Sequence, residues 1–308
     1  MAALRGQFIF ALMLTRLPGL LAVFILWLLH FLPLPVLALL GRGLGRLLYV
    51  LARSRRRVAQ RNIDLCFPEL PAEERRKLTR EHFALLGRSM LERAILWWGS
   101  DARIRHLVRV EGEEHIHAAR TAGRPVILLA PHFLGLDAGG VAITQRFDIV
   151  SIYSKQSNPV FDQAVLRGRS RFGNQLLISR DDSARPTVKA MKAGRPFYYL
   201  PDISPRRRDA VFVPFFGIAT ATITGLPRLA KAAGAVVLPC VTRMLPGSAG
   251  YVVQIGPAWP DFPGADPVAD ATRMNAWIEA EIRKMPSQYY WVHRRFKTRP
   301  QRSDPSLY

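Results

Sequence analysis

Cysteine and acidic residues are scarce in this chain. Its 308 residues include 2 cysteines, Cys66 and Cys240, which are too few for a disulfide framework and lack metal-ligand spacing. Such sparse cysteine use fits a reducing compartment. Asp and Glu number 23 against 44 Lys and Arg, giving a formal net charge of +21. This excess predicts an anionic partner: a nucleic acid, an anionic membrane or a phosphorylated substrate.

Several common motifs are also absent. The sequence has no G-x-S-x-G nucleophile elbow, no phosphate-binding P-loop and no G-x-G-x-x-G. The glycines from Gly41 to Gly45 adjoin an apolar segment and do not form a nucleotide-binding loop. His115 and His117 lie among glutamates, as expected of a solvated helix start rather than a metal site. We therefore expect neither a cofactor nor a metal.

Apolar residues dominate positions 17 to 40, and no charged residue occurs between Arg16 and Arg42. A helix of this length covers roughly the 30 Å hydrocarbon core of a bilayer. Pro33 and Pro35 interrupt its second half, so the segment either kinks and crosses or dips into one leaflet. The run is longer than the core of a cleaved signal peptide. We expect a retained membrane anchor over residues 1–45, followed by one globular domain over 46–308.

Arginines are concentrated on one side of this anchor. Only Arg5 and Arg16 precede it, whereas seven follow at Arg42, Arg46, Arg53, Arg55, Arg56, Arg57 and Arg61. The positive-inside rule places the globular domain on the cytoplasmic side of the membrane. Arginines next to the bilayer also favour anionic head groups.

The globular part alternates short apolar runs with helical patterns. Residues 71–98 are expected to form a long helix. The expected strands are Val126–Ala130, Ile149–Tyr153, Leu176–Ile178, Phe197–Leu200, Val211–Val213, Ala235–Thr242 and Tyr251–Ile255. The expected helices are Leu136–Arg146, Val160–Phe172, Ala184–Ala193, Thr224–Ala233 and Pro267–Met285. This alternation predicts a single α/β domain with a largely parallel or mixed central sheet flanked by helices.

His132 and Asp137 are the strongest candidates for catalysis. Val126–Ala130 is an expected buried strand, Pro131 ends it, and His132 lies where the chain leaves the sheet. Ligands of α/β sheets bind at this edge. Five residues separate the pair by about 140° on an ideal helix, so they meet only if His132 precedes the helix. The imidazole would accept a proton from a hydroxyl, and the carboxylate would fix its tautomer. A structural histidine is the alternative.

Three further residues follow other elements. Lys155 comes just after the strand ending at Tyr153, and Arg169 lies near the end of an expected helix. Asp202 follows the strand ending at Leu200 and is either a site carboxylate or the cap of a turn before Pro205. A guanidinium suits a phosphate or a phosphopantetheine. We take Lys155, Arg169 and Asp202 as candidate substrate-binding residues.

Over nearly its whole length, the chain resembles the late acyltransferases of lipid A biosynthesis, the bacterial lauroyl and myristoyl transferases. The His132-x-x-x-x-Asp137 pattern alone is shared with all glycerolipid-type acyltransferases. More specific are the run Arg61-Asn-Ile-Asp-Leu-Cys-Phe-Pro-Glu69 and the tail Trp291-Val-His-Arg-Arg-Phe-Lys-Thr-Arg-Pro300. Also matching are Arg169-Ser-Arg-Phe-Gly173 and Val211-Phe-Val-Pro-Phe-Phe-Gly217 with Thr220-x-Thr222.

The resemblance implies transfer of an acyl chain from acyl carrier protein to a hydroxyl of a lipid A precursor. It implies His132 as the base, Asp137 as its partner, and Arg169 and Asp202 near the site. Many members carry Glu at the position of Asp137 and a second Asp at that of Ser204. The alternatives are a glycerophospholipid acyltransferase with the same pair, or a membrane-tethered protein binding anionic lipid or nucleic acid. The basic residues form no recognisable nucleic-acid module, so we expect no nucleic-acid partner.

Overall fold

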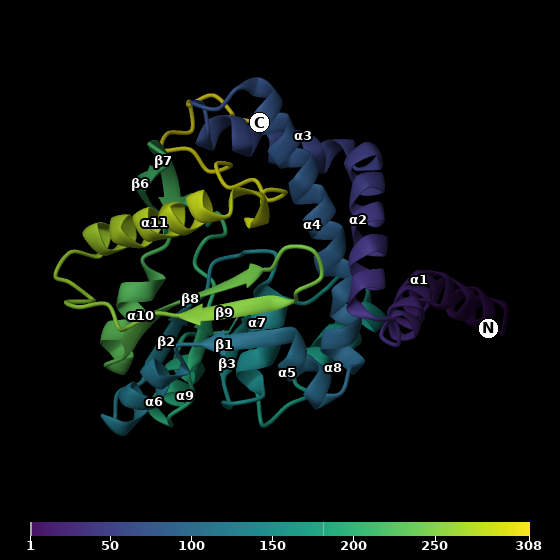
Figure 1. Cartoon of the computed structure of the whole chain (residues 1–308), viewed down its shortest axis with the longest axis horizontal. Coiled ribbons are helices and arrows are strands. Elements are labelled where there is room, and N and C mark those ends of the chain that lie inside the picture. Colours follow the sequence, from purple (N-terminus) through teal and green to yellow (C-terminus); the bar gives the residue numbers. More distant parts are fainter. Residues whose placement is uncertain (1, 181) are drawn as a thin grey trace.

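The computed structural model describes residues 2–180 and 182–308, and the side chains of 16–308 except positions 181 and 209. Arg5, counted in the charge asymmetry, therefore has no described side chain. The apolar segment forms two helices, α1 (Ala2–Leu29) and α2 (Leu34–Leu51), which are separated by a turn before Pro33. Proline fixes φ and removes a main-chain donor, so a helix breaks readily there. Helix α1 projects from the body of the protein (Figure 1).

Helix α2 packs along the long helix α4 (Ala72–Trp98), as Figure 1 shows. Glycines allow this close contact: a Cβ at Gly45 would lie 2.0 Å from the carbonyl oxygen of Phe83. A Cβ at Gly87 would lie 2.1 Å from the carbonyl oxygen of Gly41. Of the described helices, α2 alone is long and apolar enough to cross a membrane by length and composition, and 22% of it is buried. The expected boundary at residue 45 falls inside α2.

A seven-stranded sheet forms the centre of the fold, in the order β1-β9-β8-β2-β5-β3-β4. Strands β8, β2, β5, β3 and β4 are parallel, while β9 runs antiparallel to β8 and β1 is parallel to β9. The strands are β1 (Val108–Glu111), β2 (Val126–Leu129), β3 (Val150–Tyr153), β4 (Leu176–Ser179), β5 (Phe197–Tyr199), β8 (Val236–Met244) and β9 (Tyr251–Ile255). The predicted α/β fold with a largely parallel, mixed sheet is confirmed.

Two apolar layers cover the faces of this sheet. Successive residues of β2 alternate between them: Val126 and Leu128 belong to one layer, and Ile127 and Leu129 to the other. Both layers are needed because all four side chains are buried, as is typical of a central parallel strand. The remaining helices are α3 (Arg53–Cys66), α5 (Asp101–Leu107), α6 (Glu113–Thr121), α7 (Leu136–Thr144), α8 (Pro159–Arg169), α9 (Arg185–Lys192), α10 (Gly225–Ala233) and α11 (Pro267–Lys284).

The strand expected at Val211–Val213 lies outside the main sheet. It belongs to β6 (Val211–Phe215), which pairs with β7 (Ile218–Thr222) in an antiparallel hairpin. Phe216 and Gly217 form the turn with φ of 50° and 73°. The matching Thr220-x-Thr222 stretch is thus part of strand β7. The short strands β1 and β7 were not predicted from the sequence either.

The C-terminal segment ties distant parts of the chain together. The Asn62 side-chain amide donates to the carbonyl oxygens of Trp291 and His293, both at 2.7 Å, and the Trp291 side chain is fully buried. Figure 1 shows this segment beside α3. The two family-specific sequence runs, around Asn62 and Trp291, therefore support each other structurally.

A buried ion pair links α4 to the sheet. The Arg88 Nε donates to Glu92 at 2.7 Å, the two side chains are 1% and 0% exposed, and the Tyr251 hydroxyl also bonds to Glu92. Substituting Glu92→Gln would leave the Arg88 charge buried without a counter-ion. We expect it to lower the free energy of unfolding by about 3 kcal/mol. Thermal melts of the purified protein measure this. Glu73→Gln, at an exposed pair with Arg76 and Arg80, is the matched control and should change the midpoint little.

Candidate active site

His132 lies in the loop between β2 and α7, at the carboxyl edge of the central parallel strands. Its Nδ1 is 2.7 Å from Oδ1 of Asp202, and its main-chain N–H donates to Asp202 Oδ2 at 3.0 Å. Asp202 follows β5, the strand next to β2 in the sheet. One carboxylate therefore fixes both the backbone and the ring of His132.

This contact determines which ring nitrogen can react. A carboxylate only accepts hydrogen bonds, so Nδ1 of His132 carries the proton and Nε2 keeps its lone pair. The His132 side chain is 21% exposed, whereas that of Asp202 is 1% exposed. The arrangement is that of a general base whose tautomer is set by a buried acid.

Asp202 is held in its ionised form. Burial acts to raise its pKa, but the neighbouring His132 and the hydrogen bonds from it lower the pKa to about 2. The Tyr289 hydroxyl also hydrogen-bonds to Asp202, and its own pKa is raised well above the ordinary value by burial and by the carboxylate. Asp202 thus stays charged at any pH at which His132 can act as a base.

Asp137 does not make the contact expected of it. Its expected partner is His132, but its carboxylate is bound by Arg93 Nε at 2.7 Å and by Arg169 at 2.8 Å. Asp137 lies on the first turn of α7 and faces the arginines of α4 and α8, whereas the loop after β5 brings Asp202 to the imidazole. The expected hydrogen-bond partner is therefore corrected to Asp202. A catalytic role for Asp137 stays a prediction.

The charge of Asp137 is also stabilised. Burial acts to raise its pKa, but Arg93 and Arg169 outweigh burial and hold the pKa well below its usual range. The three side chains are 17%, 32% and 38% exposed, in the order Asp137, Arg93 and Arg169. Two guanidinium groups thus converge on one carboxylate at the edge of the site, leaving a net positive charge where an anionic substrate could bind.

The remaining candidate, Lys155, lies apart from these contacts. It is exposed after β3, and no hydrogen bond or ion pair is found for it among the described residues. Arg169, by contrast, lies in the site as expected. Two residues of the site, Arg93 and Tyr289, were not predicted from the sequence. Arg93 is one of several arginines on a long helix, and Tyr289 lies 87 positions from Asp202, so neither had a local signal.

The loop bearing His132 is held by the segment that follows α11. The main-chain N–H of Tyr290 donates to the His132 carbonyl oxygen at 2.9 Å, and Leu134 N–H donates to the Gln288 carbonyl oxygen at 2.8 Å. Phe133 and Tyr289 form an isolated β-bridge between them. His132 is therefore positioned by three separate parts of the chain, which limits its freedom before substrate binds.

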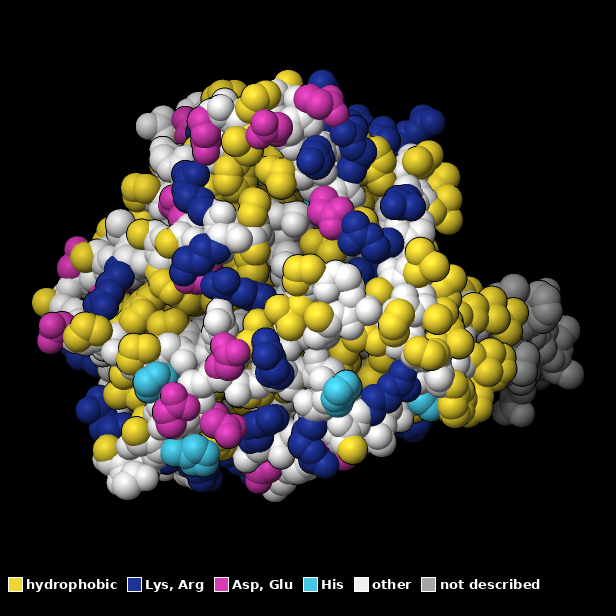
Figure 2. All heavy atoms as spheres, in the orientation of Figure 1, with side chains coloured by type: hydrophobic (Ala, Val, Ile, Leu, Met, Phe, Trp, Pro, Cys, Tyr) yellow, Lys and Arg dark blue, Asp and Glu magenta, His cyan; other side chains and the backbone are white. Residues whose placement is uncertain are grey.

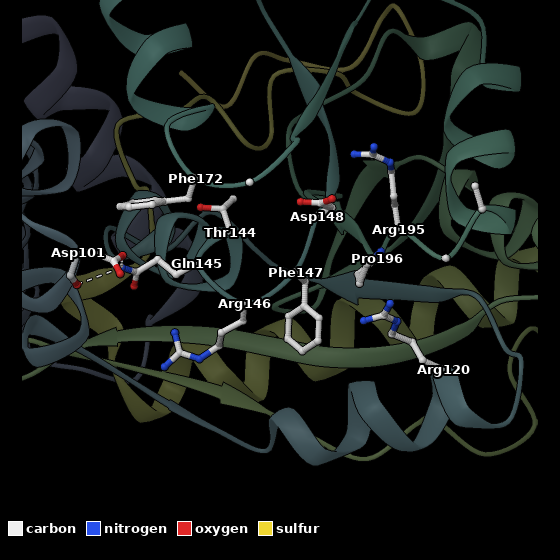
Figure 3. Close-up of a pocket in the computed structure, with 13 residues that line it drawn as sticks. Asp101, Arg120, Thr144, Gln145, Arg146, Phe147, Asp148, Phe172, Arg195 and Pro196 are labelled. Carbon is white, nitrogen blue, oxygen red and sulfur yellow. Dashed lines mark hydrogen bonds between the residues drawn. The ribbon is translucent and has the colours of Figure 1, made fainter.

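A large polar cavity lies at the opposite edge of the sheet. Figure 3 shows it between the segments that precede β3, β4 and β5, lined by Arg120, Arg146, Arg195 and Asp148. Arg146 pairs with Glu113 at 2.9 Å. None of the residues predicted from the sequence lines this cavity, so its size alone does not make it the active site.

The depressed pKa of Asp202 predicts an acid-sensitive stability. An Asp has an unfolded pKa near 4, so its stabilising effect is complete above that value and is lost as pH falls through about 2. We expect the unfolding free energy of the wild type to fall between pH 4 and pH 2 by about 2 kcal/mol more than that of Asp202→Asn. Denaturant titrations at several pH values measure this difference, and parallel curves would contradict it.

Comparisons with known proteins identify the family of this chain. The family model described as bacterial lipid A biosynthesis acyltransferase matches residues 10–298. The chain is 36% identical to the lipid A biosynthesis lauroyltransferase of Escherichia coli over 94% of each chain. It is 35% identical to the palmitoleoyltransferase of that pathway over 92% of each chain, and 34% identical to the myristoyltransferase over 86% of this chain and 81% of that one, both from the same organism.

A solved structure, the 1-acyl-sn-glycerophosphate acyltransferase PlsC from Thermotoga maritima, aligns with 82% of this chain and 97% of that one. Its TM-score is 0.37 at 17% identity, too low to add to the argument. The family match, by contrast, covers nearly the whole chain, including the positions of His132 and Asp202. The chain therefore belongs to the bacterial lipid A biosynthesis acyltransferase family, and it is an acyltransferase.

Proposed function

We propose that the protein transfers a fatty acyl chain from acyl carrier protein to a hydroxyl group of a lipid A precursor. The acceptor would be the 3-hydroxyl of a hydroxyacyl chain already attached to a phosphorylated glucosamine disaccharide. The observation that carries this proposal is the contact between His132 and the buried Asp202, which leaves Nε2 of His132 able to accept a proton. Family membership supplies the reaction class.

The proposed reaction is a direct transfer. Nε2 of His132 takes the proton of the acceptor hydroxyl as its oxygen attacks the thioester carbonyl carbon. The carbon–sulfur bond then breaks, the new ester forms, and the departing thiolate takes the proton from the imidazolium. Asp202 stabilises the positive charge on His132 during this step. No covalent acyl-enzyme is needed, because the attacking oxygen belongs to the acceptor.

Positive charge serves both proposed substrates. Acyl carrier protein is acidic, and the lipid A precursor carries phosphates, so each is attracted to a chain with a net charge of +21. Arg169 is 38% exposed and uses one of its terminal nitrogens for Asp137. Its remaining donors and the exposed Lys155 are our candidates for the phosphate groups.

Membrane attachment through α1 and α2 is part of the proposal. Their described outer surfaces and the turn between them expose large apolar side chains, including Leu20, Phe24, Phe31, Leu39 and Leu47. Figure 2 shows this apolar area beside the body, with arginines above it. Because α2 is packed against α4 along its length, we infer that its outer face lies in one leaflet of the inner membrane. The basic surface would then face anionic head groups on the cytoplasmic side.

Mass spectrometry of lipid A tests this function. Cells that lack the protein should lose one secondary acyl chain, and restoring the gene should return it. Purified protein should then transfer the same chain from acyl carrier protein to the lipid A precursor. Transfer to a lysophospholipid in place of the precursor would favour the glycerophospholipid reaction instead. Salt-sensitive nucleic-acid binding without any acyl transfer would contradict both enzymatic functions.

A further inference from the structure

A narrow slot opens beside the active site, between α7 and the sheet. One face of α7 forms its first wall through Asp137, Gly140, Val141 and Thr144. Gly140, Val141 and Thr144 follow Asp137 by three, four and seven residues, so all four positions lie in one row along the helix. The row is about 10 Å long at 1.5 Å per residue. The slot therefore runs from the mouth at Asp137 to an inner end at Thr144.

The opposite wall comes from three neighbouring strands. It includes Ser151 of β3, Leu177 of β4 and Tyr198 of β5, together with Leu200 just after β5. Leu200 precedes Asp202 by two residues, so the mouth of the slot lies at the same edge of the sheet as the His132–Asp202 pair. The slot is narrow, with a cavity volume of about 60 Å³, and most of its lining surface is apolar. This shape suits a single extended alkyl chain better than a sugar.

Gln175 closes the inner end. Its Nε2 donates to the carbonyl oxygens of Phe172, Phe147 and Thr144 at 2.7, 3.3 and 3.4 Å. Its Oε1 accepts from the main-chain N–H of Ile149 at 2.7 Å. Thr144, Phe147 and Phe172 also line the polar cavity at the far edge of the sheet (Figure 3). A side chain hydrogen-bonded through both its oxygen and its NH₂ group thus separates the apolar slot from that polar cavity.

We propose that this slot holds the acyl chain of the donor thioester and that Gln175 sets the longest chain accepted. The inference rests on the proposed function, because it needs an acyl donor reacting at His132. The chain would enter past Asp137 with its carbonyl near His132 and extend along α7 until its methyl end meets Gln175. One methylene in an apolar pocket changes the specificity constant about 10-fold or more, so a fixed end discriminates chain lengths.

Gly140 provides an independent way to shorten the slot. A Cβ there would meet Tyr198 Cε1 at an ordinary 3.7 Å and nothing nearer, so a larger side chain projects into the slot without a backbone clash. Gly43, an exposed helical glycine whose Cβ would meet nothing within 4 Å, is the matched control. Gln175→Ala has the opposite effect, because it removes the end wall and joins the slot to the polar cavity.

The experiment compares the full-length wild type with Gly140→Leu, Gln175→Ala and Gly43→Leu. Each is given an equimolar mixture of decanoyl, lauroyl, myristoyl and palmitoyl carrier protein with the lipid A precursor, and products are resolved by mass. We expect Gly140→Leu to shift preference toward shorter chains by about 10-fold in relative kcat/KM. Gln175→Ala should raise the relative rate with the next longer chain by a similar factor. Gly43→Leu should keep the wild-type profile.

The ratio between chain lengths separates the possible outcomes. A variant that is merely destabilised loses activity with every donor and keeps the ratio. Unchanged ratios in active Gly140→Leu and Gln175→Ala would overturn the inference while leaving the proposed function intact. A wild type inactive with all four donors would instead contradict the proposed function. If Gln175→Ala does not fold, Gly140→Leu alone decides.

Discussion

Replacing His132 by Ala is expected to lower kcat/KM for acyl transfer by about 10²–10⁴-fold, the range typical of a lost general base. The reason is geometric. Nδ1 of His132 is held by the buried carboxylate of Asp202, which leaves Nε2 to accept the proton. Without this ring, no positioned group takes the hydroxyl proton. Transfer from acyl carrier protein to the precursor, followed by mass spectrometry, measures the loss.

Two further variants test whether a loss of activity comes from the missing base or from a loss of folded structure. His132→Asn keeps a side-chain donor for Asp202 but cannot act as a base, so it should be as inactive as His132→Ala while melting closer to the wild type. His106→Ala alters an exposed histidine on α5 and should leave activity unchanged. Full activity in folded His132→Asn would remove His132 from the reaction.

The second large effect is expected at Asp202. Substituting Asp202→Asn places an amide where the carboxylate now accepts from both Nδ1 and the main-chain N–H of His132. The amide has a single oxygen, so its NH₂ group faces one of these donors and favours the tautomer with the proton on Nε2. That tautomer cannot accept the substrate proton. We expect kcat to fall by about 10²–10⁴-fold with KM nearly unchanged.

The measurement is the separate determination of kcat and KM. Asp148→Asn, an exposed acid at the opposite edge of the sheet, serves as the control. A large rise in KM with normal kcat would mean that Asp202 holds substrate, which is the role assigned from the sequence. A variant as active as the wild type would show that the imidazole does not need its buried partner.

Much of the fold could be predicted because its signals are local. The buried run at Val126 and the alternation of apolar strands and helices are properties of short segments, and the structure confirms them. The position of His132 follows from such a segment as well. The β6–β7 hairpin was not predicted, since pairing outside the main sheet depends on partners rather than on apolar content.

The partners within the site were harder to predict because they come from different strands and helices. Asp137 is close to His132 in sequence, yet the arginines of α4 and α8 compete for its carboxylate. Asp202 is 70 positions from His132 and reaches it only because β2 and β5 are neighbours in the sheet. Spacing along the chain could suggest which residues gather at this edge. It could not decide which acid meets the imidazole.

The close glycine contacts between α2 and α4 have a consequence for how the protein can be handled. Leu37, Ala38, Gly41 and Gly45 are buried, so half of the apolar N-terminal region belongs to the folded body rather than to a detachable tether. Trimming the chain within α1 removes its contacts with α4 and α8, and trimming past α2 also strips one side of α4 and exposes core residues to water. We therefore expect that deleting both apolar N-terminal helices, α1 and α2, does not yield a folded, water-soluble catalytic fragment.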